Sequence, residues 1–315
     1  MDEGPQLSAI VVVGTCRRRS QRVVTALCRQ SAIAVMEVIV VDLCGAGEAR
    51  LETLDGVRVV YLSRPTASLW STARFEGLCR ASAPVVAFIE DHCFPAPTWA
   101  VALIEAHQAP WVAVGYAFTN ANPKTYISRG SMVNDYGFWL HPARPGAAVF
   151  LPGNNISYKR DVLLSYGDRL EGLLTPDFSL QEALARRGLP MCIEPQAMAA
   201  HQNFTRLAHL MRANRAYARL LAARRVRFQS WSVPRRVFYA LVTPVSAPLL
   251  GVLRLLGSLR GRTSLLPVVL AGLPVHAITH GWSAWGEAAG YLFGEGSAEQ
   301  ELHYWEIEAE REAGG

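Results

Sequence analysis

The sequence predicts an α/β fold with a mixed, mostly parallel sheet, flanking helices, and a helical region later in the chain. Three observations favour this class. Continuous apolar runs rich in β-branched residues recur in the first part of the chain, as in strands covered on both faces. Apolar residues at helical spacing lie between these runs, which is typical of βαβ units. The last third of the chain alternates arginines with long uncharged stretches.

The first expected βαβ unit consists of strands at 8–13 and 37–42 with a helix at 20–30 between them, and its crossover should be right-handed. The same alternation then continues along the chain. It gives a strand at 57–62, a helix at 69–81, a strand at 85–89, a helix at 99–107, a strand at 111–117 and a late strand at 189–195.

Acidic side chains end two of these strands. Asp42 ends the second run, and Glu90, Asp91 and His92 follow the fourth. Ligands of open α/β sheets bind at the carboxyl ends of strands. Carboxylates with an imidazole suit Mg²⁺ or Mn²⁺ holding a diphosphate, and the histidine favours Mn²⁺. The alternative is that these strands simply end in solvent, and Asp42 or the acidic pair alone does not decide between the two.

The chain lacks the sequence motifs that are typical of several other classes of protein. No GxGxxG fingerprint follows the first run and no GxxxxGK[ST] motif is present, so neither a dinucleotide site nor a P-loop is indicated. The six cysteines form no CxxC pair, and the acidic start does not resemble a signal peptide. A reduced, cytosolic environment is therefore expected.

Five short motifs resemble, in order, the nucleotide-binding half of inverting family 2 glycosyltransferases, which have the GT-A fold. The motifs are a first strand followed by Thr15 and Arg17, a strand ending in Asp42, Thr72-Ala-Arg-Phe-Glu-Gly77, Phe88-Ile-Glu-Asp-His92, and Trp99. The resemblance implies that Thr15 and Asp42 contact the nucleotide and that Arg74 lies near the diphosphate. It implies that Glu90, Asp91 and His92 bind the metal and the sugar nucleotide. Cys16 and the mixed Glu-Asp-His cluster depart from the family pattern.

The resemblance extends to the acceptor half. Asn154, in a Gly-Asn-Asn segment, is expected to contact the sugar nucleotide. Asp177 matches the family's catalytic base, although a first-turn acid at a helix start is the alternative, with Asp168 and Glu171 as other bases. His201 matches a family histidine near the metal, so the implied metal ligands are Asp91, His92 and His201. Residues 120–146 are expected to form a long irregular segment.

Charge divides the rest of the chain sharply. Residues 196–286 contain twelve arginines and no acidic residue, whereas 287–315 contain eight glutamates and one arginine. Uncharged stretches at 237–253 and 265–279 are interrupted by prolines, so interfacial helices, a short membrane hairpin and a buried basic bundle all remain open. Arginines beside such stretches favour an anionic membrane surface. No nucleic-acid module surrounds them, and the glutamate-rich tail is expected to be a solvated helix or disordered.

These observations predict a catalytic domain at 1–205, a membrane-associated helical region at 206–294 and an acidic tail at 295–315. The predicted function is metal-assisted, inverting transfer of a sugar from a nucleotide-diphosphate sugar to a hydroxyl of a glycan or lipid-linked acceptor, with Asp177 as general base. The expected location is the cytoplasmic face of the membrane. The alternative is a membrane-docked nucleotide-sugar-binding protein without catalysis.

Overall fold

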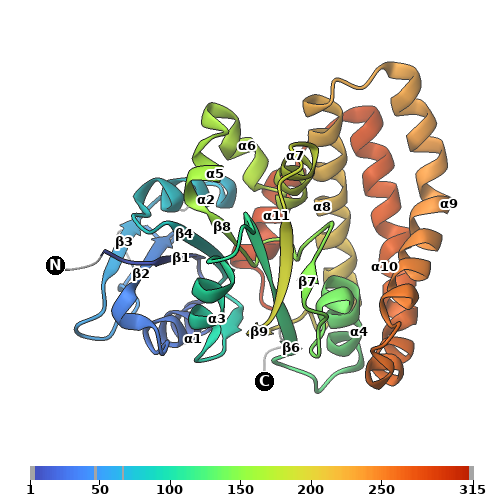
Figure 1. Ribbon diagram of the computed structural model, residues 1–315. Helices are drawn as coiled ribbons and strands as arrows, with labels where there is room; N and C mark the ends of the chain where they lie inside the picture. The colour runs from blue at the N-terminus through green and yellow to red at the C-terminus, as the bar shows by residue number, and fades with distance from the viewer. Residues whose placement is uncertain (1–3, 46–47, 66, 312–315) are drawn as a thin grey trace. The chain divides into compact units, whose positions relative to one another are not determined.

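The computed structural model describes residues 4–45, 48–65 and 67–311 (Figure 1). The chain divides into two compact units. The first is Met1–Thr119 with His141–His201, and the second is Asn120–Leu140 with Gln202–Gly315. All of the residues proposed above for the catalytic and binding site lie in the first unit.

The first unit is built on one mixed sheet. In the described part of the chain, nine strands form the sheet in the order β3-β2-β1-β4-β8-β6-β9-β5, with β7 paired to β9. The strands are β1 (Leu7–Val13), β2 (Met36–Asp42), β3 (Val59–Ser63), β4 (Val85–Glu90), β5 (Cys93–Pro95), β6 (Ala113–Asn120), β7 (Gly146–Ala147), β8 (Ile156–Lys159) and β9 (Met191–His201).

Pairing in the sheet changes direction at β4. Strands β1 to β4 pair in parallel, whereas β8 runs antiparallel to β4 and β6, and β9 runs antiparallel to β5 and β7. Every residue of β1, β2 and β4 is buried, as the apolar runs predict. The mixed α/β class is confirmed, and each predicted strand overlaps a strand of the sheet.

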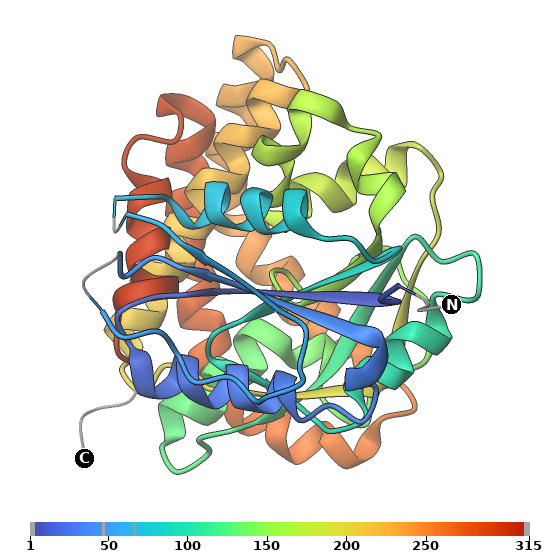
Figure 2. The ribbon, with the colours of Figure 1, turned by 90° about the vertical axis from the view of Figure 1, so that its left-hand side faces the viewer.

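Helices cover both faces of this sheet. They are α1 (Arg17–Cys28), α2 (Trp70–Arg80), α3 (Trp99–Ala106), α5 (Arg160–Leu164), α6 (Leu170–Leu174) and α7 (Asp177–Arg186), with short 3-10 turns η1 (Ile33–Val35) and η3 (Gly167–Arg169). Helices α1 and α2 lie on opposite faces (Figure 2). Helix α1 buries Val23, Val24 and Leu27, the residues whose spacing predicted it. Helix α2 approaches the sheet so closely that a Cβ at Gly77 would lie 2.6 Å from Ile10 Cγ2.

The second unit is helical. Its elements are α4 (Tyr126–Tyr136), η2 (Gly137–Trp139), α8 (Leu207–Phe228), α9 (Val233–Ser258), η4 (Thr263–Leu265), α10 (Leu266–Phe293), α11 (Ala298–His303) and the π-helical turn η5 (Tyr304–Glu308). Helix α10 packs against α4, α8 and α9 (Figure 1). Helix α9 and the segment Thr263–Phe293 are long and apolar enough to cross a membrane, with mean hydropathies of 1.6 and 1.3.

Helix α4 corrects one expectation. Residues 120–146 were predicted to be irregular because they are polar and contain Pro and Gly. Instead, the Thr125 hydroxyl caps α4 by accepting a hydrogen bond from the Ser128 N–H. The Ser128 hydroxyl in turn donates to the Asn122 carbonyl oxygen at 2.6 Å. Local side-chain capping therefore starts a helix where composition alone indicated a loop.

The acidic C-terminal segment corrects a second expectation. Residues 298–311 are not a solvated tail, because Leu302, Trp305 and Ile307 are buried. Trp305 belongs to an apolar cluster with Phe204 and other residues of the second unit. Arg224 forms ion pairs with Glu299 and Glu295, at 2.9 and 3.1 Å. Residues 312–315 lie outside the described residues.

Candidate active site and metal centre

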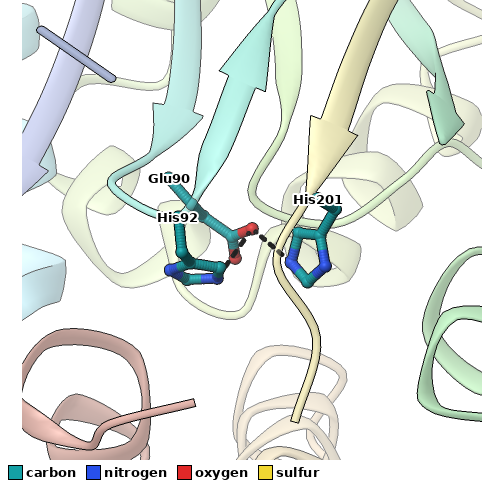
Figure 3. Close-up of side chains that lie close together, drawn as sticks. All are labelled: Glu90, His92 and His201. Carbon is teal, nitrogen blue, oxygen red and sulfur yellow. Dashed lines mark ion pairs between the residues drawn. The ribbon is translucent and has the colours of Figure 1, made fainter. Parts of the chain in front are cut away.

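Three side chains of the first unit converge into a cluster suited to a metal ion (Figure 3). Glu90 Oε2 lies 3.3 Å from His92 Nε2 and 3.4 Å from His201 Nε2. One ligand atom from each residue lies within 4.8 Å of the others. All three residues are buried, with exposed fractions of 6% or less. Below, Glu90, His92 and His201 are called the metal cluster.

Sheet register explains how distant residues form this cluster. Glu90 ends β4, so His92 follows two residues later at the carboxyl end of the strand. Short strand β5 then pairs with β9, and Cys93 lies opposite His201 in that pairing. His201 is therefore brought next to His92, and the two rings meet edge to face with centroids 4.9 Å apart.

Asp91 lies behind His92 rather than in the metal cluster. Its carboxylate contacts His92 Nδ1 at 2.9 Å and accepts hydrogen bonds from Arg19 Nε and the Ser20 hydroxyl, both at 3.1 Å. A carboxylate bound to one ring nitrogen orients the other toward a metal. Burial would raise the pKa of the Asp91 carboxyl, but the Arg19 charge and the contact with His92 lower it. Asp91 is therefore an anion that fixes the His92 ring.

The donor set of the metal cluster fits a divalent transition metal. A carboxylate with two imidazoles is a set that Mn²⁺, Fe²⁺ and Zn²⁺ accept. Burial would raise the pKa of the Glu90 carboxyl, but the neighbouring His92 and His201 rings hold it well below its ordinary value. Glu90 is thus ionised, as a metal ligand must be.

Two asparagines connect the metal cluster to the predicted base. Asn154 Nδ2 donates to Glu90 Oε1 at 2.8 Å, and its backbone N–H donates to Asp177 Oδ2 at 2.8 Å. Asn154 adopts a left-handed backbone with φ of 67°. Asn155 accepts a hydrogen bond from the Glu90 N–H at 3.0 Å and donates to the Glu90 carboxylate. Asn154 Oδ1 is buried and has no hydrogen-bond partner among the described residues.

Asp177 and Arg74 form a buried ion pair. Arg74 Nη2 donates to Asp177 Oδ2 at 3.0 Å, and Nη1 contacts the other carboxylate oxygen. Asp177 is 0% exposed and Arg74 is 2% exposed. The guanidinium also lies 4.5 Å from the Phe88 ring centroid. Asp177 is the first residue of α7, as the sequence predicted for an acid at a helix start. Its carboxylate lies inside the unit, where it contacts Arg74.

A separate anchor forms at the end of β2. Arg17 Nη1 and Nη2 bind the two oxygens of Asp42 at 2.9 and 3.0 Å, and the Tyr61 hydroxyl also donates to this carboxylate. Burial would raise the pKa of the Asp42 carboxyl, but these donors lower it. Thr15 is exposed in the turn between β1 and α1, and its carbonyl oxygen accepts the Arg17 N–H at 2.8 Å.

The structure thus brings together most, not all, of the residues proposed from the sequence. Glu90, His92, His201, Asn154, Asp177 and Arg74 form one contact network, joined through His92 by Asp91. Asp42 and Thr15 lie near Arg17 instead. The sequence reasoning missed Arg19, Ser20, Asn155 and Tyr61. Only Asn155, adjacent to Asn154 in the same motif, carried a signal that pattern reading could have used.

Residues 8–167, which include Glu90, His92 and Asn154, match the model of the family described as Glycosyl transferase family 2. The chain belongs to glycosyltransferase family 2. The family predicted from the motif order is therefore confirmed. The match ends before Asp177 and His201, so their roles rest on the geometry above and on the motif resemblance.

Solved structures resemble this family 2 chain in fold. The mannosyltransferase PcManGT from Pyrobaculum calidifontis, in complex with GDP-Man and Mn²⁺, has a TM-score of 0.55 at 15% identity over 91% of this chain and 86% of that one. A mycobacterial protein has a TM-score of 0.46 at 18% identity, covering 71% and 75%. TarS 1-349 from S. aureus has a TM-score of 0.48 at 15% identity, covering 90% of each chain. No protein with a curated description matches.

Proposed function

We propose that this family 2 member is an inverting glycosyltransferase that moves a sugar from a nucleotide-diphosphate sugar to an acceptor hydroxyl. One observation carries the proposal most. A metal-capable cluster and a buried carboxylate at the family's base position belong to one hydrogen-bonded network, joined by Asn154. The PcManGT complex with GDP-Man and Mn²⁺ supports a sugar nucleotide and a divalent metal as the ligand class. Inversion follows from the family resemblance.

In this proposal the metal cluster holds Mn²⁺ or Mg²⁺, with Mn²⁺ favoured by the two imidazoles. A bound divalent metal neutralises charge on the diphosphate leaving group. Asp91 fixes the His92 ring so that Nε2 faces the cluster. The alternative, predicted from the sequence, is that Asp91 binds the metal directly. Metal-binding measurements on variants distinguish these two roles of Asp91.

Asp177 takes the proton from the acceptor hydroxyl as the oxygen attacks the anomeric carbon. Arg74 orients this carboxylate through the ion pair. Asn154 Oδ1, which lacks a partner among the described residues, accepts a hydrogen bond from a sugar hydroxyl. Asp42, held by Arg17 and Tyr61, contacts the nucleoside near the Thr15 turn. Arg74 as a diphosphate ligand remains a prediction from the family resemblance.

To test this proposal, the rate of sugar transfer by Asp177→Asn is measured with a panel of nucleotide sugars and Mn²⁺. We expect a loss of about 10²–10⁴-fold in turnover, because general-base catalysis contributes that much. Donor binding, measured by calorimetry below the melting temperature, should persist. Asp161→Asn, an exposed acid in the first turn of α5, is the matched control and should keep full activity. Turnover near the wild-type rate in Asp177→Asn would instead assign the base to another acid, such as Glu171 or Asp168.

A second candidate is a nucleotide-sugar-binding protein that has lost catalysis. The observation in its favour is that both oxygens of Asp177 are engaged by Arg74. Calorimetry with UDP, GDP and Mn²⁺, paired with assays of donor hydrolysis and transfer, separates the two. Binding without hydrolysis or transfer by the wild-type chain favours the second candidate.

The acceptor and location are proposed from the second unit. Two long apolar helices and an acid-free, arginine-rich segment support association with an anionic membrane. The proposed acceptor is therefore a glycan or a lipid-linked molecule at the cytoplasmic face. Pelleting of active enzyme with cell membranes tests this location, and recovery of all activity in the soluble fraction would reject it.

A further inference from the structure

Helix α9 exposes a continuous apolar face. Five large side chains recur at spacings of three or four residues and therefore share one side of the helix. They are Phe238, Leu241, Val245, Leu249 and Leu253, each between 55% and 74% exposed. The opposite side of the helix buries Ala240, Thr243 and Leu255. These five exposed side chains are called the α9 face. Soluble monomers rarely expose so many large apolar side chains together, so the α9 face indicates a binding surface.

Arginines lie at both ends of the α9 face. Arg235 is in the first turn of α9. Arg254 lies close to the C-terminal end of the helix, and Arg260 lies just beyond it. All three are exposed, and none forms an ion pair with an acidic residue in the described part of the chain. The Arg235 guanidinium lies over the Trp231 ring, 4.1 Å from its centroid, and its charge is not neutralised by this contact. Cations without acidic partners around an apolar surface complement a bilayer that contains anionic headgroups. The charges and the apolar face therefore fit the same partner.

The packing of α10 argues against a hairpin that spans the bilayer. A Cβ at Gly286 would lie 2.3 Å from the Arg215 carbonyl oxygen, and one at Gly290 would lie 2.4 Å from that of Arg219, so α10 lies directly against α8. Helix α8 carries six arginines between Leu207 and Phe228. A spanning α10 would draw this helix into the hydrocarbon, where each arginine is costly.

The arginine distribution gives a second argument. A hairpin of α9 and α10 that crossed the bilayer would carry its connection, with Arg254 and Arg260, to the far side. Short loops rich in arginine stay on the cytoplasmic side. Arginines at both ends of α9 are instead compatible with a helix whose two ends remain on one side of the membrane.

We propose that α9 lies in the plane of the membrane interface, with the α9 face in one leaflet and Arg235, Arg254 and Arg260 at anionic headgroups. Helix α10 is then the support behind α9, held by α8 and α4. The chain is monotopic, and no segment of the second unit crosses the bilayer. This inference deepens the proposed membrane location, but its tests require no donor, metal or turnover.

Binding to vesicles tests the surface. The full chain is sedimented with vesicles of phosphatidylcholine, with and without phosphatidylglycerol. We expect binding to the anionic vesicles, weakened by salt, and a loss of at least about tenfold in Val245→Glu because a charge enters the apolar face. Val149→Glu is the matched control, since Val149 is 84% exposed in the first unit and should bind normally. Three results would overturn the proposal. They are unchanged vesicle binding by Val245→Glu, equal binding to vesicles with and without phosphatidylglycerol, and formation of a dimer through the α9 face without vesicle binding.

Labelling tests whether the chain crosses the membrane. Native Cys79 is exposed in the first unit and reports the side on which that unit lies. Ser264→Cys, an exposed position between α9 and α10, is introduced with Cys79→Ser, and sealed membrane vesicles are treated with an impermeant maleimide. We expect Cys79 in the parent and the new cysteine to react from the same side. Protection of the new cysteine until detergent is added, in vesicles where Cys79 of the parent reacts without detergent, would overturn the proposal and leave the transferase assignment untouched.

Discussion

Asp91 and His201 contribute to the metal cluster in different ways, and this difference can be measured. His201 offers Nε2 to the cluster, whereas Asp91 contacts only the far nitrogen of His92. We expect His201→Ala to abolish Mn²⁺ binding in calorimetry, and Asp91→Asn to weaken it by about 10–100-fold, as for other residues behind metal ligands. His141→Ala, at an exposed histidine, is the control. Equal and complete loss in both variants would make Asp91 a direct ligand, as predicted from the sequence.

Asp42 should make stability depend on pH. Its folded-state pKa lies below the ordinary value of 3.8, so its stabilisation is present at neutral pH and is lost as the pH falls through the folded-state pKa. Asp42→Asn should cost about 1.5–3 kcal/mol at neutral pH, because it weakens charge-assisted bonds from Arg17 and Tyr61. Urea denaturation across acid pH should show the difference from wild type shrinking below 3.8. Asp55→Asn, at an exposed position, should show no such trend.

Glu90 and His92 belong to the metal cluster, whereas Asp91 between them does not. Side chains alternate across a strand, so residues two apart share a side and the residue between them faces away. Strand β4 ends at Glu90, and Asp91 and His92 lie in the turn that follows, so this rule does not apply to them. The family resemblance implied Asp91, His92 and His201 as metal ligands, whereas in the structure Asp91 contacts Nδ1 of His92. The arrangement of these side chains therefore required the turn between β4 and β5 and the pairing of β5 with β9.

At the scale of elements, strand positions followed from apolar runs, but pairing did not. The antiparallel pairing of β8 with β4 and β6 left no signal in composition, because both directions bury the same residues. The contact between Arg74 and Asp177 joins residues 103 apart in the chain, and only the tertiary fold determines it. The sequence therefore supplied the site residues through motif order, whereas the geometry of their contacts required the sheet.

The packing of α4 on α10 predicts opposite effects for two glycines of the same helix. A Cβ at Gly272 would lie 2.6 Å from Val133 Cγ2, whereas nothing lies within 4 Å of one at Gly281. Gly272→Ala should lower the free energy of unfolding by about 1–3 kcal/mol through overpacking. Gly281→Ala should raise it by about 0.4–1 kcal/mol by restricting the unfolded chain. Chemical denaturation measures both changes in the free energy of unfolding. A higher free energy of unfolding in Gly272→Ala would contradict the close packing of α4 on α10.

At the scale of the whole molecule, the sequence showed that basic and acidic residues are segregated along the chain, but it did not show which of them form ion pairs. The arginine-rich and glutamate-rich regions suggested separate environments. In the second unit they partly neutralise each other, because Arg224 binds Glu295 and Glu299, and Arg225 lies 3.6 Å from Glu287. The acidic segment folds because it also carries Trp305 and Ile307 into the apolar interior. Arg235, Arg254 and Arg260 form no such ion pair among the described residues and lie at the two ends of the α9 face, which is why they are assigned to the membrane surface.

The two compact units predict two calorimetric transitions that respond to different changes. If the proposed function is right, GDP or UDP with Mn²⁺ binds only the native first unit, and at a concentration of about 100 times Kd it adds about 2.7 kcal/mol to that unit. Its transition should rise by roughly 5–10 °C, and chelation of the metal should reverse the rise. Trp305→Ala should lower the other transition, since loss of a buried tryptophan costs about 3–5 kcal/mol.

The neighbouring Tyr304, which is 48% exposed, supplies the control: Tyr304→Ala should leave both transitions nearly unchanged. A single transition that moves with both the nucleotide and Trp305→Ala would show that the units unfold together. The nucleotide would then stabilise the second unit as well, and donor binding would strengthen the proposed membrane attachment through a shared folding equilibrium. Separate transitions instead make catalysis and attachment independent, so that Val245→Glu should release the enzyme from vesicles without changing its affinity for nucleotide.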